Sequence, residues 1–249
     1  MGTTKRRSVT LHLCAVAQRS RVVAKIGELL EAFRRFAPPH SWGLNRADEG
    51  YSRERVSDYV TRCQDPTMIL TWRGERPLRY QTWLQLNLRH PSTVKTELPA
   101  AERLQPEQAR LPYDLGDALV RTIQPDFAAL GPLTDGERVR EVDALGISTR
   151  VRATDYAKHG PYGLAVRTYF GPRLRGLFGN RALAASGCEL AEVGDHLRLD
   201  LLPEPWARAT AELLPRLRAA DQALASSGVF AVGDDEPVPG SRWAPPPVG

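Results

Sequence analysis

The residues of this chain whose types suit acid–base or metal chemistry are few and scattered. Its five histidines are His12, His40, His90, His159 and His196. No two of them form an HxH or HExxH pattern, so the sequence predicts no local metal site. We interpret His12 and His196 as ordinary sheet residues, because both lie in strand-like segments. His159 lies beside a Gly-Pro pair in a loop and has no partner motif for general-base catalysis.

The acidic residues indicate no active site either. Asp114 and Asp117 lie three apart at the start of a predicted helix, where carboxylates stabilise the helix amino terminus. Glu141 and Asp143 lack the lysine that follows in metal-dependent nuclease motifs. The chain contains no GxSxG elbow, no Walker loop and no GxGxxG sequence. We therefore expect no catalysis and no cofactor or metal ion.

One group of cations and aromatic residues suits nucleic-acid binding. Its members are Arg150, Arg152, Arg167, Arg173, Arg175 and Arg181, with Tyr156, Tyr162, Tyr169 and Phe170. Such residues contact phosphates and stack on bases. In the alternative interpretation the aromatic rings are core and the arginines line an exposed side. We favour the alternative because no DNA- or RNA-binding motif accompanies the group, and we keep nucleic-acid binding as the second hypothesis.

Composition predicts a globular protein of the cytoplasm. The chain has 249 residues, of which 42% are hydrophobic, enough for a substantial core. Its 34 basic and 29 acidic residues give a net charge of +5, and the arginines are interleaved with acids over most of the chain. The three cysteines are isolated, which fits a reducing compartment. We find neither a secretory leader nor an apolar run long enough to span a bilayer.

The first part of the chain predicts a strand over 8–17, a helix from Ser20 to Phe36 and a second helix from Ser52. A short strand over 67–72 and a longer one over 78–89 follow. The longer strand alternates, with leucines, Tyr80 and Thr82 on a core face and polar residues on a wet face. Residues 40–50 are predicted to be a loop, and 90–112 an irregular, proline-rich stretch.

The predicted contact surface for a partner consists of the solvent-exposed face of the strand over 78–89 and the loop around Trp42. Tryptophan and arginine are over-represented among the residues that dominate binding energy. We therefore expect partner contacts at Trp42, Arg79, Trp83 and Arg89.

In the second part we expect a helix over 113–131 that is kinked or split at Pro125. The segment 163–179 carries the clearest local sequence signals of the chain. We expect a strand that ends at Gly171 and a helix that begins at Pro172, because the missing N–H of proline costs nothing at the first position of a helix. A hairpin around Gly194 and a long helix over 206–226 follow. The tail over 233–249 is rich in proline and glycine and is expected to be extended.

This order of elements predicts the α+β class, with a mixed or mostly antiparallel sheet and helices packed on one face. We expect a single domain over 1–232, with two similar β-α-β-β-like halves, 1–112 and 113–232, as its possible subdivision.

The last third of the chain resembles immunity proteins of bacterial toxin systems, most closely the type VI secretion immunity family. The resemblance rests on Arg167, Thr168, Tyr169, Phe170, Gly171 and Pro172, followed by a short helix, a leucine-rich hairpin and a terminal helix. It implies an α+β fold without catalysis, whose task is to bind and neutralise a cognate toxin encoded by an adjacent gene. These six residues carry over as a structural motif, and no catalytic residues transfer.

The net charge bears on the kind of toxin. An immunity protein for a cationic nuclease is expected to be acidic, and +5 has the wrong sign for steering such a pair together. The sequence therefore favours an acidic toxin or a toxin that acts by another chemistry. Otherwise the acidic residues of this chain must be clustered at the contact surface.

Overall fold

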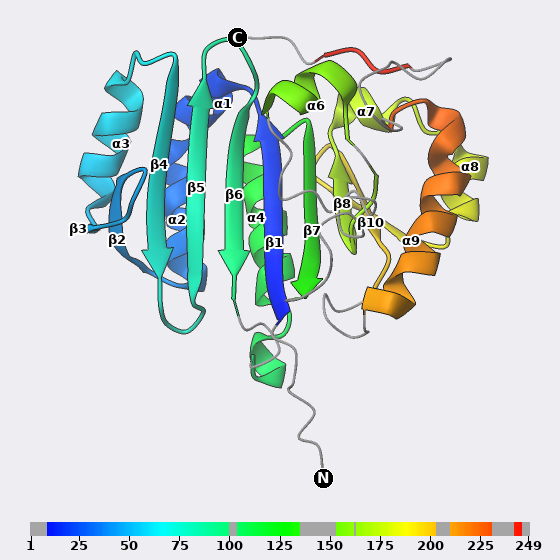
Figure 1. Ribbon diagram of the computed structural model, residues 1–249, viewed down its shortest axis with the longest axis horizontal. Coiled ribbons are helices and arrows are strands. Elements are labelled where there is room, and N and C mark those ends of the chain that lie inside the picture. Colours follow the sequence, from blue (N-terminus) through cyan, green and yellow to red (C-terminus); the bar gives the residue numbers. More distant parts are fainter. Residues whose placement is uncertain are drawn as a thin grey trace.

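The computed structural model describes residues 9–99, 104–134, 153–161, 163–202, 210–230 and 242–245. Ten strands in these ranges form one antiparallel sheet in the order β3-β2-β4-β5-β6-β1-β7-β8-β10-β9 (Figure 1). The predicted α+β class and antiparallel sheet are confirmed. Most of the predicted extended tail lies outside the described residues.

The first part of the chain forms, in order, β1 (Val9–Ala17), α1 (Arg19–Ala24), α2 (Ile26–Phe36), β2 (Pro39–Leu44), β3 (Glu49–Gly50), α3 (Arg53–Arg62), β4 (Thr67–Gly74), β5 (Tyr80–Asn87) and β6 (Ser92–Leu98). β4, β5 and β6 follow one another as an antiparallel meander. Helix α3 begins where the Ser52 side chain accepts a hydrogen bond from the backbone N–H of Arg55, as an N-cap residue does.

The second part forms, in order, η2 (Pro106–Gln108), α4 (Leu111–Ile123), β7 (Phe127–Thr134), α6 (Ala153–His159), β8 (Arg167–Phe170), α7 (Pro172–Arg175), α8 (Asn180–Ala185), β9 (Glu189–Val193), β10 (His196–Asp200), α9 (Thr210–Leu224) and η3 (Ala225–Ser227). β1 pairs with both β6 and β7. The sheet is therefore continuous across the predicted boundary between 1–112 and 113–232.

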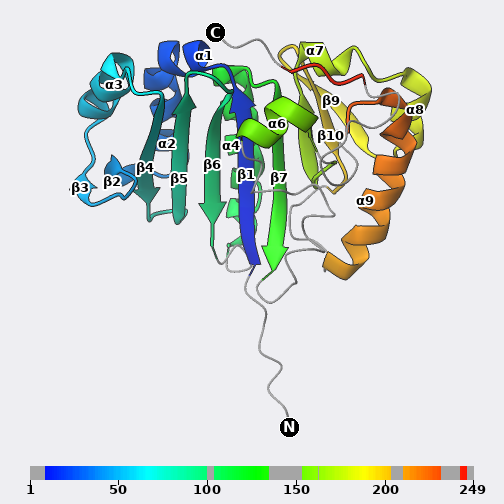
Figure 2. The same cartoon turned by 45° about the horizontal axis from the view of Figure 1, so that its top comes forward.

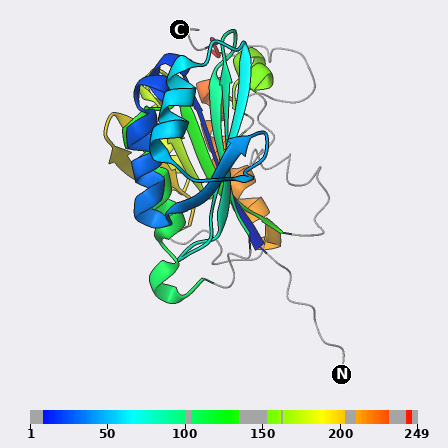
Figure 3. The same ribbon diagram turned by 90° about the vertical axis from the view of Figure 1, so that its left-hand side faces the viewer.

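The helices lie on both faces of the sheet, and not on one face as expected. Alternate residues of β1 divide between two cores: Leu11, Leu13 and Ala15 join α2 and α4, whereas Cys14 and Val16 join α6 and α9. Figure 1 shows α2 and α4 behind the sheet, and the edge-on view of Figure 3 shows these blue and green helices on one side of the strands. The reason is in β1 itself, which is apolar on both faces and so needs cover on both.

The structure differs most from the prediction over residues 113–131, where a single helix was expected. Helix α4 ends at Ile123, the left-handed residue Gln124 has φ 43°, and the chain then enters β7, between β1 and β8. The helix therefore ends before Pro125, which neither kinks nor splits it. Phe127 lies four residues after Ile123, which is a helical spacing, yet pairing with β1 decides its conformation.

Three strands come from segments that were expected to be irregular. β2 overlaps the predicted loop over 40–50 and pairs with β4 and with β3, which lies within that loop. β6 lies within 90–112 and pairs with β5 and β1. The alternation predicted for β5 is confirmed, since Tyr80, Thr82 and Leu84 are buried. Leu88, which follows the end of β5, is 46% exposed.

Candidate functional site

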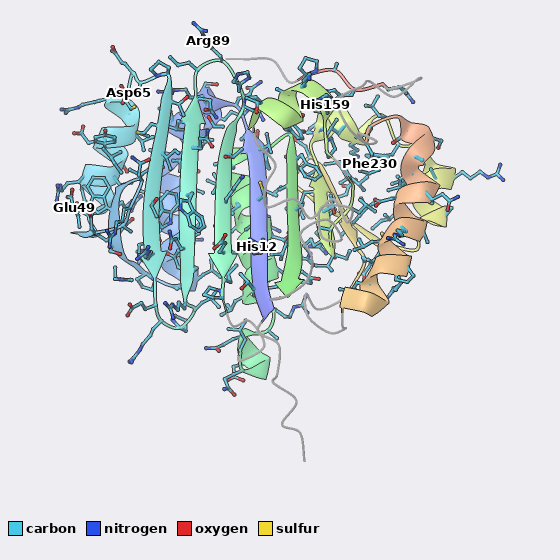
Figure 4. All side chains as sticks on the ribbon, viewed as in Figure 1. His12, Glu49, Asp65, Arg89, His159 and Phe230 are labelled. Atoms are coloured by element: carbon cyan, nitrogen blue, oxygen red, sulfur yellow. The ribbon has the colours of Figure 1, made fainter. Side chains whose placement is uncertain are left out.

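The meander β4, β5 and β6 presents one sheet face that no described helix or strand covers (Figures 1 and 4). Its side chains point away from α2 and α4. The strand registers arrange them in three rows of three, which we call the meander face: Arg73, Gln81 and Glu97; Thr71, Trp83 and Lys95; and Ile69, Gln85 and Thr93.

Trp83 occupies the centre of the meander face. It lies directly opposite Thr71 on one neighbouring strand and Lys95 on the other, at positions where cross-strand side chains are in contact. Gln81 and Gln85 flank it along β5, and all but Thr71 of these residues are half-buried. A partly exposed aromatic ring surrounded by hydrogen-bonding side chains is the arrangement typical of the energetic centre of a protein–protein contact.

The first row of the face continues onto β1, where His12 lies opposite Glu97 (Figure 4). His12 Nδ1 is 3.7 Å from Glu97 Oε1, but burial, followed by the charge of Lys95, lowers the pKa of His12 to about 4. Burial also raises the pKa of Glu97. The imidazole is therefore neutral at neutral pH, and this contact is not an ion pair. Thr71 Oγ1 and His12 Nε2 are both buried without a hydrogen-bond partner.

The four predicted contact residues do not come together. Trp42 is 5% exposed and lies on the opposite sheet face, against Tyr59 and beneath the guanidinium of Arg55. Arg79 and Arg89 are exposed just beyond opposite ends of β5. Of the four, only Trp83 is on the meander face itself, with the two arginines at its rim.

Sequence reasoning missed Lys95 and Glu97, because it treated their strand as irregular. A signal was present: Val94, Thr96 and Leu98 alternate with them, and these three residues are buried. The prolines on either side of this short pattern obscured it.

A separate cavity of about 290 Å³ lies where β1 ends and β7 begins. Its walls include Arg21, Pro91, Asp126, Arg173 and His196. Figure 2 brings this end of the sheet forward and shows α6 and α7 beside it. The cavity is therefore assembled from loops that lie far apart in the sequence.

Three polar side chains that line this cavity, Asp126, Arg173 and His196, are hydrogen-bonded within the protein. Asp126 accepts hydrogen bonds from Tyr156 Oη at 2.6 Å and from Arg173 Nε at 3.0 Å. His196 Nε2 is 2.7 Å from the Pro125 carbonyl oxygen, and burial lowers the pKa of His196. These bonds fix the loops around the cavity, and they leave the Asp126 carboxylate engaged rather than free for proton transfer.

The segment Arg167 to Pro172 forms strand β8 and the first residue of α7. Arg167 is 4% exposed and donates to both carboxylate oxygens of Asp200, at 2.5 and 2.9 Å. Its guanidinium lies over the Tyr113 ring of α4, 3.6 Å from the centroid. Tyr169 Oη donates to Asp117 Oδ1 at 2.7 Å. Asp117 was predicted to stabilise a helix end, but in the structure it joins α4 to β8.

The predicted cluster of cations and aromatics does not form a surface in the described residues. Tyr156, Tyr169 and Phe170 are fully buried. Of the arginines, Arg167 and Arg173 pair with aspartates, and Arg175 pairs with Glu192. Of the remaining members, Arg181 is exposed at the start of α8, and Arg150, Arg152 and Tyr162 lie outside the described residues.

Two further properties concern the described part of the chain only. It contains no group of three or more His, Cys, Asp or Glu side chains placed to hold a metal ion. None of its helices is both long and apolar enough to cross a membrane.

Fold and site together define an α+β protein whose ten-stranded antiparallel sheet leaves a mixed polar and aromatic face available for contact. Among solved structures, the chain is similar to the Pseudomonas aeruginosa T6SS protein PA0821, with a TM-score of 0.59 and 12% sequence identity. The similarity covers 96% of this chain and 80% of that one, and it shows a shared fold. Comparison with protein-family models gave no match, and comparison with curated protein sequences gave none either.

Proposed function

We propose that this protein is an immunity protein of a type VI secretion system, which binds a cognate toxin in the cytoplasm and neutralises it without catalysing a reaction. The observation that carries the proposal is the fold similarity to a T6SS protein over 96% of the chain. That solved structure supports the connection to type VI secretion.

The neutralising role rests on the sequence resemblance of the last third to immunity proteins. The motif that carries this resemblance forms strand β8 and the start of α7, and it is buried from Arg167 to Gly171. The engaged polar groups of the cavity at the end of β1 also favour binding over catalysis.

Nucleic-acid binding, the second hypothesis, gains no support from the described residues. Base stacking requires exposed aromatic faces, and the three described aromatics of the predicted cluster are fully buried.

Co-expression with the toxin encoded by the adjacent gene tests the proposal. We expect growth of cells that produce the toxin to be restored by this chain, and the two proteins to co-purify. Because neutralisation by binding is stoichiometric, protection should disappear when the toxin is in molar excess. Protection that persists at a small fraction of the toxin concentration would indicate an enzyme, and absence of both rescue and co-purification would contradict the proposal.

A further inference from the structure

Several basic residues of the helices form ion pairs with acidic side chains, whereas the basic residues of the meander form none with described residues. On α2 and α3, Arg34 binds Glu31 at 2.7 Å and Arg62 binds Asp58 at 2.7 Å. In the second part of the chain, Arg173 binds Asp126 at 2.5 Å. In each of these pairs the charge of the arginine is neutralised by a neighbouring carboxylate.

The segment 67–98 holds five basic and two acidic residues, a balance of +3 within a total of +5. The basic residues are Arg73, Arg76, Arg79, Arg89 and Lys95. None of them forms a salt bridge with a described residue, and Arg73 Nε instead donates to Gln81. The acids Glu75 and Glu97 contact His40 at 3.6 Å and His12 at 3.7 Å. The meander therefore carries a net positive charge of +3.

These charges surround the exposed side of the meander face. Lys95 lies beside Trp83, and Arg73 lies at one corner of the meander face, on β4. Arg76 and Arg79 are exposed in the turn before β5, and Arg89 projects beyond its other end (Figure 4). The result is an aromatic centre with cations on three sides.

We propose that the meander face is the docking surface for the toxin and that its occupant is an acidic protein surface which covers Trp83. This inference rests on the proposed function and adds the site and the chemical class of the partner. Charge complementarity argues for it, because unpaired cations attract and orient an anionic partner. The half-buried Trp83 supplies the apolar contact that such an interface needs at its centre.

A protein is favoured over a nucleic acid at this face. Glu97 is 44% exposed on the meander face, where it repels every phosphate of a nucleic-acid backbone, whereas an acidic protein surface also carries N–H and O–H donors that can pair with it. Gln81 and Gln85 also offer donors and acceptors suited to a polypeptide surface. Trp83 is the single aromatic residue among the nine of the meander face, so this face is a poor platform for stacking successive bases.

The test uses the full chain and two triple variants of equal charge change. The first is Arg76→Glu, Arg79→Glu, Lys95→Glu, at the meander face. The matched control is Arg110→Glu, Arg181→Glu, Arg218→Glu, three exposed arginines on or beside helices away from that face. Poly-L-glutamate is the acidic polypeptide probe and oligodeoxythymidylate the nucleic-acid probe, with binding followed by fluorescence anisotropy and folding by circular dichroism.

We expect the meander variant to bind poly-L-glutamate at least about 10-fold more weakly than the native chain, and the control less than about 2-fold more weakly. Equal weakening in both variants would show that net charge alone is responsible and would overturn the proposal. Tighter binding of oligodeoxythymidylate at the same face would overturn it in favour of nucleic acid. If the triple variant does not fold, the single exchanges Arg79→Glu and Lys95→Glu are compared with Arg218→Glu by the same criteria.

Trp83→Ala separates this inference from the proposed function. In the co-expression assay we expect Trp83→Ala to lose co-purification and rescue, while Leu44→Ala, an exposed apolar residue near the sheet edge, retains both. If Trp83→Ala still protects, the chain is an immunity protein but the docking surface is elsewhere. If the native chain gives no rescue while the probe experiment succeeds, the acidic-partner surface stands and the toxin-neutralising role fails.

Discussion

The side chain of Arg167 is held in the core by Asp200 and Asp117 and by the ring of Tyr113. Removing two charges from water is costly, and the network compensates through close, multiple hydrogen bonds. Arg198 also donates to Asp117, at 2.9 Å, so the four charged side chains balance one another. The network ties α4 to the strands of the second part of the chain.

Neutralising Asp200 should therefore be strongly destabilising. Asp200→Asn leaves Arg167 with one carboxylate fewer in a buried setting, and we expect a loss of about 3–5 kcal/mol in the free energy of unfolding. Urea denaturation followed by circular dichroism measures it. The control is Glu192→Gln, which removes the exposed partner of Arg175 and should change stability little. A loss in Asp200→Asn as small as in the control would show that the network contributes nothing.

Asp221 should make stability depend on pH. Burial raises its pKa to about 7, although the Leu164 N–H that it accepts at 2.9 Å acts in the opposite direction. The folded carboxyl keeps its proton to a higher pH than the unfolded one, whose ordinary pKa is 3.8. Its contribution to stability is thus present at low pH and lost as pH rises through about 7.

Replacing this group with a neutral amide removes that loss. We expect Asp221→Asn to be more stable than the native chain by about 2 kcal/mol at about pH 8 and similar to it at about pH 4. Chemical denaturation of both proteins across this range measures the difference. A difference that stays constant with pH would contradict the expected protonation.

At the scale of elements, the turn from β8 into α7 is fixed by close backbone packing. A Cβ atom on Gly171 would lie 2.9 Å from the carbonyl oxygen of Pro125 and 3.1 Å from that of Asp126. The Gly171 N–H also donates to the Asp126 carbonyl at 2.9 Å. Glycine is therefore required by the proximity of the α4–β7 turn, and not by its own φ of −63°.

Gly171→Ala should force the two turns apart and destabilise the fold by about 1–3 kcal/mol. The matched control is Gly176→Ala at the end of α7, where the nearest atom to an added Cβ is 3.8 Å away. Thermal unfolding of both variants tests the comparison. Equal melting temperatures would show that the turns separate without cost.

The described segment 242–245 packs against α6 and α7. The Trp243 ring meets Tyr156 edge-on at 4.9 Å between centroids, and the Arg173 guanidinium lies 4.7 Å from the Trp243 centroid. Arg173 Nη1 also donates to the Ala244 carbonyl at 2.5 Å. This contact joins the end of the chain to the core on the α6 and α9 side of the sheet.

We expect Trp243→Ala to reduce the free energy of unfolding by about 1–3 kcal/mol through lost apolar burial and ring contacts. Trp243→Phe should recover part of that loss, because a ring remains to contact Tyr156. Guanidinium denaturation of the three proteins measures the series. No loss in the alanine variant would show that the segment leaves the core without cost.

At the scale of the whole molecule, the uneven charge has a consequence for association. The meander carries +3 of the net +5, so an acidic partner approaches this face preferentially. For the proposed toxin partner, we expect the association rate constant to fall at least about 10-fold between low and physiological salt, with a smaller change in the dissociation rate constant. Surface plasmon resonance in a salt series measures both. A salt-independent association rate would contradict electrostatic steering.

The sequence by itself determined the elements whose pattern is local. β5 and β10 were predicted by alternation, α2 by helical spacing and α7 by Pro172 at its start, because the physical cause of each lies within a few residues. It also identified Trp83 as a contact candidate. It did not place β2, β6 or β7, whose conformations depend on neighbouring strands that come from distant parts of the chain.

The tertiary structure alone decided which polar residues are exposed. Arg167 and Arg79 are the same residue type in strand-like contexts, yet Arg167 is buried by Asp200, 33 residues away, whereas Arg79 is exposed. Trp42 and Trp83 looked equally suited to a contact and lie on opposite faces of one sheet. Sequence fixes which residues alternate along a strand, but long-range strand pairing and helix packing decide which of the two faces meets a partner.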